Sequence, residues 1–237
     1  MKIYITRHGQ VCPKDFFGST DYPADDIPLS ELGISQADRL GKKLRELGFK
    51  GKVCSSPYRR TMMTAKEVSE HCNVKVYPDG ALREMFFSAE RAEEFSGMTL
   101  LELKEAFGCV STDALLEYPW WTTDVDTKDV VAKRLKGFWE ALLENEEEDV
   151  LLVCHGASVF GTMCFLNEKY NLGMPCDYDQ MADYLAQRNL NCSLSCIEID
   201  RDKNLVSAKM FSTDYLMDNM LTSNANFRER PDTVYIK

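Results

Sequence analysis

Apolar residues recur along this chain with two spacings that alternate. Short apolar runs rich in β-branched and aromatic residues predict buried strands. These runs lie at residues 2–6, 52–54, 74–77, 149–154, 194–199 and 205–211. Apolar residues at three- and four-residue intervals predict amphipathic helices over 30–48 and 127–144. Strands that alternate with helices indicate an α/β fold of three layers, with a mainly parallel central sheet flanked by helices.

Several helix ends can be predicted from single residues. Gly48 follows the last apolar position of the first helix and predicts its C-terminus. Thr99 and Glu102 have the spacing of a capping box, which predicts a helix start. Ser56 and Pro57 predict another start, with Ser56 as the N-cap and Pro57 as the first helical residue.

Residues 85–126 fit the alternation of strands and helices least well. A chain of 237 residues has the size of one domain, or of one domain with a large insertion. We therefore expect residues 1–237 to form a single domain, in which 85–126 is an insertion or lid near the active edge of the sheet.

Two of the predicted strands end in a His-Gly pair. The first strand leads into Arg7, His8 and Gly9, and the strand at 149–154 leads into His155 and Gly156. In open α/β sheets, ligands bind at the carboxyl ends of the strands. Two unrelated structural histidines would be the alternative, but both lie at the same kind of strand-to-helix corner. The third histidine, His71, lies late on a predicted helix, and we expect no chemistry from it.

Two further charged residues are predicted to reach this edge. Arg60 lies in the first turn of the predicted helix after residues 52–54, and a helix N-terminus favours anions. A surface salt bridge is the alternative interpretation for Arg59 or Arg60 taken singly. Glu84 follows Leu82 and Arg83, just after the strand-like run at 74–77, and is a possible proton donor.

In combination, these motifs resemble the histidine phosphatase superfamily, which includes the cofactor-dependent phosphoglycerate mutases. The motifs that carry the resemblance are Arg7-His8-Gly9, Ser55-Ser56-Pro57 with Arg60 and Thr64-Ala65, Leu82-Arg83-Glu84, and His155-Gly156. They occur in the family's order. Weaker agreement comes from residues 28–37, from Gly97-Met98-Thr99, and from Asn191-Cys192-Ser193 as a turn before the last core strands.

The resemblance implies a phosphohistidine intermediate on His8. Arg7, Arg60 and His155 would surround the phosphoryl oxygens, and Glu84 would protonate the leaving alcohol and then activate water. The residues expected to bind substrate are Arg7, Gly9, Gln10, Lys14, Arg60, Arg83, His155 and Gly156. Lys14 is a departure, because family members often carry an asparagine there.

Composition limits the partners and the compartment. A net charge of -10 disfavours nucleic acid and anionic membranes as partners. No apolar run is long enough to span a bilayer, and an N-terminus that enters a core strand predicts no signal peptide. Nine cysteines without a Cys-x-x-Cys pair suit a reducing cytoplasm, and few histidines predict no metal or other cofactor. Cys12 lies near His8, where cations could lower its pKa, although we expect it to be a bystander.

Three functions fit these observations. The preferred function is a phosphomonoesterase that acts on a small phosphorylated metabolite or a phosphoprotein. The second is a phosphoglycerate mutase, but residues 85–126 hold only Arg91 and Lys104 as cations to grip a carboxylate. The third is a non-catalytic phosphate-binding or regulatory module. The oligomeric state is not specified by the sequence.

Overall fold

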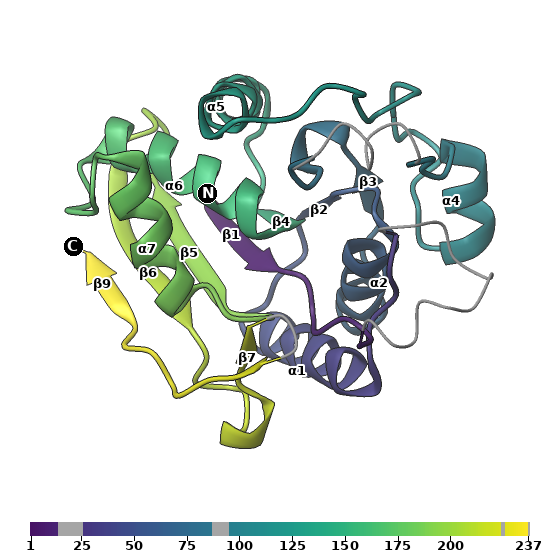
Figure 1. Ribbon diagram of the computed structural model, residues 1–237, viewed down its shortest axis with the longest axis horizontal. Coiled ribbons are helices and arrows are strands. Elements are labelled where there is room, and N and C mark those ends of the chain that lie inside the picture. The colour runs from purple at the N-terminus through teal and green to yellow at the C-terminus, as the bar shows by residue number, and fades with distance from the viewer. Residues whose placement is uncertain (14–25, 87–94, 224–225, 237) are drawn as a thin grey trace.

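A computed structural model describes residues 1–13, 26–86, 95–223 and 226–236 of the chain. Its centre is a seven-stranded sheet in the order β3-β2-β4-β1-β5-β6-β9 (Figure 1). The strands are β1 (Lys2–Arg7), β2 (Lys52–Ser55), β3 (Val76–Pro78), β4 (Val150–Cys154), β5 (Leu194–Ile199), β6 (Leu205–Ser212) and β9 (Val234–Ile236). β3, β2, β4 and β1 are parallel to one another, whereas β5, β6 and β9 each pair antiparallel to their neighbour. The sheet is therefore mixed, and its mainly parallel half agrees with the prediction.

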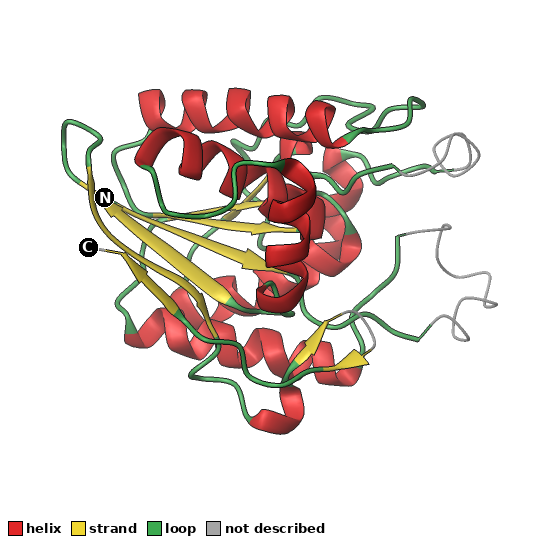
Figure 2. Cartoon of the chain, turned by 60° about the vertical axis from the view of Figure 1, so that its left-hand side comes forward, coloured by secondary structure: helices red, strands yellow, loops and turns green. Residues whose placement is uncertain are grey.

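Helices cover both faces of the sheet (Figure 2). The longer ones are α1 (Glu31–Glu46), α2 (Arg59–Cys72), α4 (Leu100–Phe107), α5 (Lys128–Asn145), α6 (Gly156–Tyr170) and α7 (Tyr178–Arg188). Short elements complete the chain: η2 (Gly80–Leu82), η3 (Asp218–Met220) and the two-stranded pair β7 (Thr222–Ser223) and β8 (Asn226–Phe227).

The two faces of the sheet belong to two separate apolar cores, because side chains alternate along a strand. Ile3 and Ile5 of β1 pack into one core with α5, α6 and α7. Tyr4, between them, packs into the other core with α1, α2 and α4. This alternation holds β1 between two helical layers and fixes the position of its carboxyl end.

Most predicted elements lie within two residues of the observed ones, and the start of α2 is the instructive exception. The helix begins at Arg59, its N-cap is Tyr58, and no side chain of the N-cap bonds to the first turn. The predicted N-cap Ser56 and first residue Pro57 are therefore wrong by two positions. Asp26 accepts the Arg59 N–H at 2.7 Å and satisfies a donor at this helix start from a distant part of the chain.

The described part of residues 85–126 carries α4 and a single bridge between Val110 and Val76. The predicted capping box of Thr99 and Glu102 is present at the start of α4. That this segment is an insertion or lid remains a prediction, and residues 87–94 lie outside the described part of the chain. Among the described residues, no helix is long and apolar enough to cross a membrane.

Candidate active site

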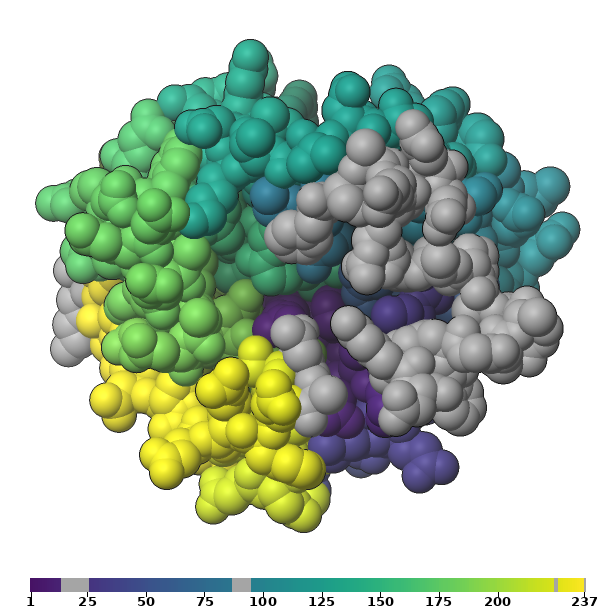
Figure 3. Space-filling view, in the orientation of Figure 1, coloured from purple at the N-terminus to yellow at the C-terminus, as the bar shows by residue number. Residues whose placement is uncertain are grey.

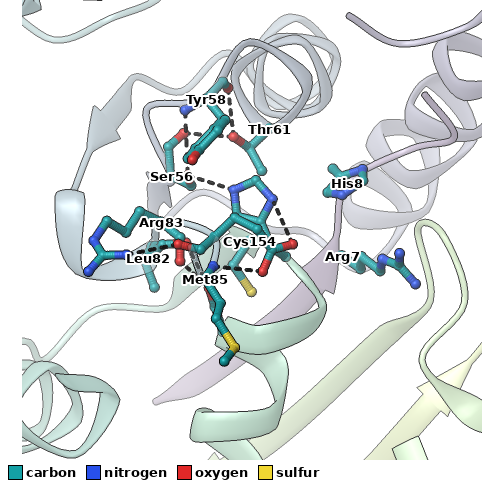
Figure 4. Close-up of polar contacts among 12 residues, drawn as sticks. Arg7, His8, Ser56, Tyr58, Thr61, Leu82, Arg83, Met85 and Cys154 are labelled. Atoms are coloured by element: carbon teal, nitrogen blue, oxygen red, sulfur yellow. Dashed lines mark hydrogen bonds and ion pairs between the residues drawn. The ribbon is translucent and has the colours of Figure 1, made fainter. Parts of the chain in front are cut away.

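The pairing of β1 with β4 brings the two strand-terminal histidines together. Arg7 is opposite Cys154 in the parallel register, so His8 and His155 follow at the same edge of the sheet. The His8 N–H donates to the carbonyl of Cys154 at 3.0 Å. The ring centroids of His8 and His155 are 5.2 Å apart, and both rings are buried. The prediction that the two His-Gly corners share one site is thus supported by this geometry (Figure 4).

A backbone contact fixes the tautomer of His8. Its Nδ1 lies 2.7 Å from the carbonyl oxygen of Gly9. A carbonyl can only accept, so Nδ1 carries the proton and Nε2 keeps its lone pair. Burial lowers the pKa of His8 well below its ordinary value, and the charges of Arg60 and Arg7 lower it further. His8 is therefore a neutral imidazole with one free nitrogen, which is the state a nucleophile requires.

The loop that carries His8 is held by three distant elements. Asn191 donates to the His8 carbonyl at 2.9 Å, from the turn before β5. The Gly9 N–H donates to Thr64 of α2 at 3.1 Å, and the Gln10 N–H donates to Gln36 of α1 at 2.8 Å. Side chains of high sequence separation therefore satisfy the polar groups of this loop.

Glycine is required at two positions of this loop contact. A Cβ on Gly9 would lie 2.5 Å from the carbonyl oxygen of Gly33 in α1, and a Cβ on Gly33 would lie 2.0 Å from the Gln10 carbonyl oxygen. Both obstacles are backbone, which cannot move aside as a side chain can. The first turn of α1 thus packs directly on the loop that carries His8.

Two buried arginines lie beside the histidines. The Arg7 guanidinium donates to the Asn189 carbonyl at 3.1 Å and to the Ser223 hydroxyl at 3.2 Å. Arg60, in the first turn of α2, lies over the ring of Tyr58 with 4.4 Å between its guanidinium carbon and the ring centroid. Burial is the main cause of the lowered pKa values of His8 and His155, and the positive charges of both arginines lower them further.

His155 connects Glu84 to the rest of the site. It is the N-cap residue of α6, and its Nε2 lies 2.8 Å from the hydroxyl of Ser56 (Figure 4). Its Nδ1 lies 3.7 Å from Oε2 of Glu84. Oε1 of Glu84 accepts the Met85 N–H at 3.0 Å. Burial is the main cause of the lowered pKa of His155, followed by the charge of Arg60. Glu84 is thus held beside a neutral imidazole.

The other residues predicted to bind substrate have varied surroundings. The Gln10 side-chain oxygen accepts from Ser30 at 2.8 Å. The Arg83 guanidinium forms a buried two-point ion pair with Asp126, so its donors are turned toward the protein. Gly156 begins α6, and a Cβ there would meet no atom within 4 Å among the described residues. Lys14 lies outside the described residues.

A segment near the C-terminus of the chain borders the site. In Figure 3, N-terminal residues coloured purple are visible in a hollow that is bordered by the yellow C-terminal segment. Ser223 of that segment contacts Arg7. Sequence reasoning missed the roles of Ser223, Asn189 and Asp126, because no local pattern marks them, and it assigned Ser56 to a helix cap.

Two side expectations can be compared with the structure. Burial raises the pKa of Cys12, whose thiol donates to the Leu29 carbonyl at 3.3 Å, so a thiolate activated by cations is not supported. His71 lies in the last turn of α2, with Nε2 2.8 Å from the carboxylate of Asp38. Asp38, Glu67 and His71 form the one group with metal-ligand spacing in the described part of the chain.

The fold and site define a class: an α/β protein with two neutral histidines and two arginines at the carboxyl edge of its sheet. The family model for the histidine phosphatase superfamily (branch 1) matches residues 3–209. The chain therefore belongs to the histidine phosphatase superfamily, as its motifs predicted.

A curated relative is also similar to this chain. The chain is 32% identical over 135 residues to "Uncharacterized phosphoglycerate mutase family protein R708" of Acanthamoeba polyphaga mimivirus, which covers 55% of this chain and 60% of that protein. The chain thus spans less than two thirds of this relative.

Two solved structures share the fold at low sequence identity. The ecdysone phosphate phosphatase of Bombix mori, in complex with tungstate, is 20% identical, with a TM-score of 0.64 over 86% of this chain and 91% of that chain. The phosphoserine phosphatase of Entamoeba histolytica, in complex with 3-phosphoglyceric acid, is 19% identical, with a TM-score of 0.58 over 91% of this chain and 99% of that chain.

Proposed function

We propose that the protein is a phosphatase that hydrolyses phosphate monoesters of small metabolites through a phosphohistidine on His8. The observation that carries the proposal is the Nδ1 contact of His8 with the Gly9 carbonyl at 2.7 Å. It leaves Nε2 of this buried, neutral ring free to act as the nucleophile. The phosphatase names of the structural neighbours support the same reaction class.

In the proposed first step, Nε2 of His8 attacks phosphorus, and the bond from phosphorus to the leaving oxygen breaks. Arg7 and Arg60 neutralise the phosphoryl oxygens, for which guanidinium donors are suited. His155 lies against the same group. Its depressed pKa results partly from Arg60 and Arg7, whose charges a bound phosphate would offset. Glu84 gives its proton to the leaving alkoxide.

In the second step, water attacks the phosphohistidine. Glu84, now a carboxylate, takes the proton of the water, and the bond between phosphorus and Nε2 breaks. Inorganic phosphate leaves, and His8 returns to its neutral form. The charge is supplied by side chains, so we expect full turnover after exhaustive chelation of divalent metals. Loss of activity on chelation, with recovery on adding one metal, would contradict this mechanism.

A mutase would use the same intermediate and return the phosphoryl group to the substrate. Lys104 is one of the two cations of residues 85–126, and its ammonium lies 3.4 Å from the Thr112 carbonyl on an exposed surface. Lys104 is therefore not available to bind the carboxylate of a glycerate substrate. Arg91 lies outside the described residues. This observation favours hydrolysis over isomerisation.

The test is a panel of phosphate esters that includes phosphoserine, 3-phosphoglycerate, an alkyl phosphate and an aryl phosphate. We expect release of inorganic phosphate from at least one ester, and mass mapping after a neutral quench should place phosphate on His8. A His8→Ala variant with substantial turnover would overturn the proposal. Isomerisation of 3-phosphoglycerate without release of phosphate would instead identify a mutase.

A further inference from the structure

Asp126 is a buried carboxylate directly before α5, and it contacts the segment that carries Glu84. Its Oδ2 accepts from Arg83 Nη1 at 2.5 Å, and its Oδ1 accepts from Arg83 Nη2 at 3.0 Å. Oδ2 also accepts the Phe86 N–H at 3.0 Å. In return, the Asp126 N–H donates to the Phe86 carbonyl at 2.9 Å. One residue thus binds the chain on both sides of Glu84.

Two helices add to this support. Ser158 of α6 donates its hydroxyl toward the carbonyls of Leu82 and Arg83, at 2.8 and 2.9 Å. Arg134 of α5 donates to the Arg83 carbonyl at 3.1 Å, and its Nη1 lies 3.6 Å from Asp126 Oδ2. The backbone at Arg83 and Phe86 is therefore fixed against the protein interior. Only Glu84 and Met85 lie between these two points.

We propose that Asp126 is a positioning residue for the general acid of this enzyme, acting through Arg83 and Phe86; the inference rests on the proposed function of Glu84. Arg83 has the same positioning role, because its guanidinium binds Asp126 and is not directed at substrate. Asp126 also joins the two ends of residues 85–126, because it is tied to Phe86. Asp126 therefore holds the backbone on both sides of Glu84 from a position 40 residues further along the chain than Phe86.

The position of Glu84 matters because its carboxyl group must lie within hydrogen-bond distance of the leaving oxygen to protonate it. The Glu84 carboxylate has a backbone contact at Met85 and a longer contact to His155, 3.7 Å from its Oε2. With these two contacts alone, the Glu84 carboxylate would move whenever the backbone of Glu84 moves. A shift of about 1 Å in a catalytic group can reduce turnover by roughly 10²-fold.

A purely structural ion pair is the competing explanation, and the leaving group separates the two. Glu84 is needed most when the leaving oxygen is a poor one, as in β-glycerophosphate, and least for p-nitrophenyl phosphate. Displacement of Glu84 should therefore reduce kcat/KM for β-glycerophosphate selectively. Loss of stability alone reduces the amount of folded enzyme, and it affects both substrates equally.

The experiment compares Asp126→Asn with the matched control Asp38→Asn on the folded enzyme. Asp38 is also an aspartate in an ion pair, with Lys42 at 2.7 Å, but it is part of α1 and contacts His71 of α2, away from Glu84. We expect Asp126→Asn to lower kcat/KM for β-glycerophosphate about 10–100-fold and for p-nitrophenyl phosphate less than about 3-fold. Asp38→Asn should change neither. If Asp126→Asn does not fold, Arg83→Lys keeps the charge without the two-point contact and should show the same selectivity, reduced in size.

A double-mutant cycle with Glu84→Gln completes the test. Once the acid is absent, Asp126→Asn should cause no further loss for β-glycerophosphate. Equal losses for both substrates, no loss, or fully additive losses in the Glu84→Gln background would each overturn the positioning role alone. A Glu84→Gln variant with unchanged turnover of β-glycerophosphate would overturn the acid role first, and the present inference with it.

Discussion

At the residue scale, the site consists of ionisable groups whose buried surroundings set their charge. His8 and His155 are neutral because burial and the charges of Arg60 and Arg7 lower their pKa values. Neutral His8 is available as a nucleophile at neutral pH, where an ordinary histidine would be partly protonated. The same surroundings make protonation of these rings costly in the folded state.

Acid should therefore destabilise the protein through these two rings. The unfolded chain binds a proton to each histidine below about pH 6.5, whereas the folded protein does not until a lower pH. The free energy of unfolding should fall as pH decreases below that value, by about 1.4 kcal/mol per pH unit and per histidine at most. Urea unfolding at pH 7.5 and 5.5 measures this slope. A His8→Asn and His155→Asn double variant should lose it, and an unchanged slope would contradict the neutral assignment.

Replacement of Glu84 by Gln tests the proposed general acid. The amide keeps the shape of the side chain and removes the proton, so turnover of an alkyl phosphate should fall about 10²–10⁴-fold. The loss should be smaller for an aryl phosphate, since its leaving group needs no proton. Steady-state kinetics with both substrates measure the difference. An equal loss for good and poor leaving groups would count against the acid-base role.

At the element scale, the contact between α1 and the loop that carries His8 leads to a specific prediction. Gly33→Ala places a methyl group 2.0 Å from the Gln10 carbonyl oxygen, which forces the loop beside His8 to move. We expect a loss of about 1–3 kcal/mol in the free energy of unfolding, together with reduced kcat/KM. Gly137→Ala in α5 is the matched control, because a Cβ there meets no atom within 4 Å among the described residues. It should stabilise the protein by about 1 kcal/mol. Thermal unfolding and steady-state kinetics of both variants test this prediction. A fully active Gly33→Ala variant would show that the loop tolerates the extra methyl group.

Elements also show what the sequence could predict. Runs of apolar residues placed β1 and β4, and with them His8 and His155, because strand periodicity and a strand-terminal position are local features. The partners of these residues were not predictable in this way. Ser223 contacts Arg7 across 216 residues of sequence, and Asp126 contacts Arg83 across 43. Neither contact follows from a regular spacing in the sequence, because each forms only when the folded sheet brings distant segments together.

At the scale of the whole molecule, an acidic protein concentrates its functional cations inside. The net charge is -10, yet Arg7 and Arg60 are both buried at the carboxyl edge of the sheet. An anionic substrate is therefore attracted by the site and not by the surface at large. Aromatic residues surround the same edge. Tyr58 lies 4.9 Å from the ring of His155 and 5.2 Å from Trp120, between ring centroids.

The adjacent tryptophans of this aromatic cluster should have different roles. Trp120 is buried, donates its indole N–H to the Met98 carbonyl at 2.9 Å, and covers Gly97 so closely that a Cβ there would lie 2.0 Å from its ring. We expect Trp120→Ala to cost about 3–5 kcal/mol of stability, as an anchor of residues 85–126 on the sheet. Trp121 is half-buried, and its ring packs edge-on against Phe95 and Trp120.

Trp121 is therefore the one of the two that can act as an apolar wall for substrates with a ring or hydrophobic body beside the phosphate. Trp121→Ala should raise KM for such substrates, leave small phosphate esters nearly unchanged, and lower stability far less than Trp120→Ala does. KM values for bulky and small esters, together with urea unfolding of each variant, distinguish a structural role from a role in substrate binding. If Trp121→Ala alters KM for no ester, or for bulky and small esters alike, both tryptophans serve structure and the substrate body is recognised elsewhere.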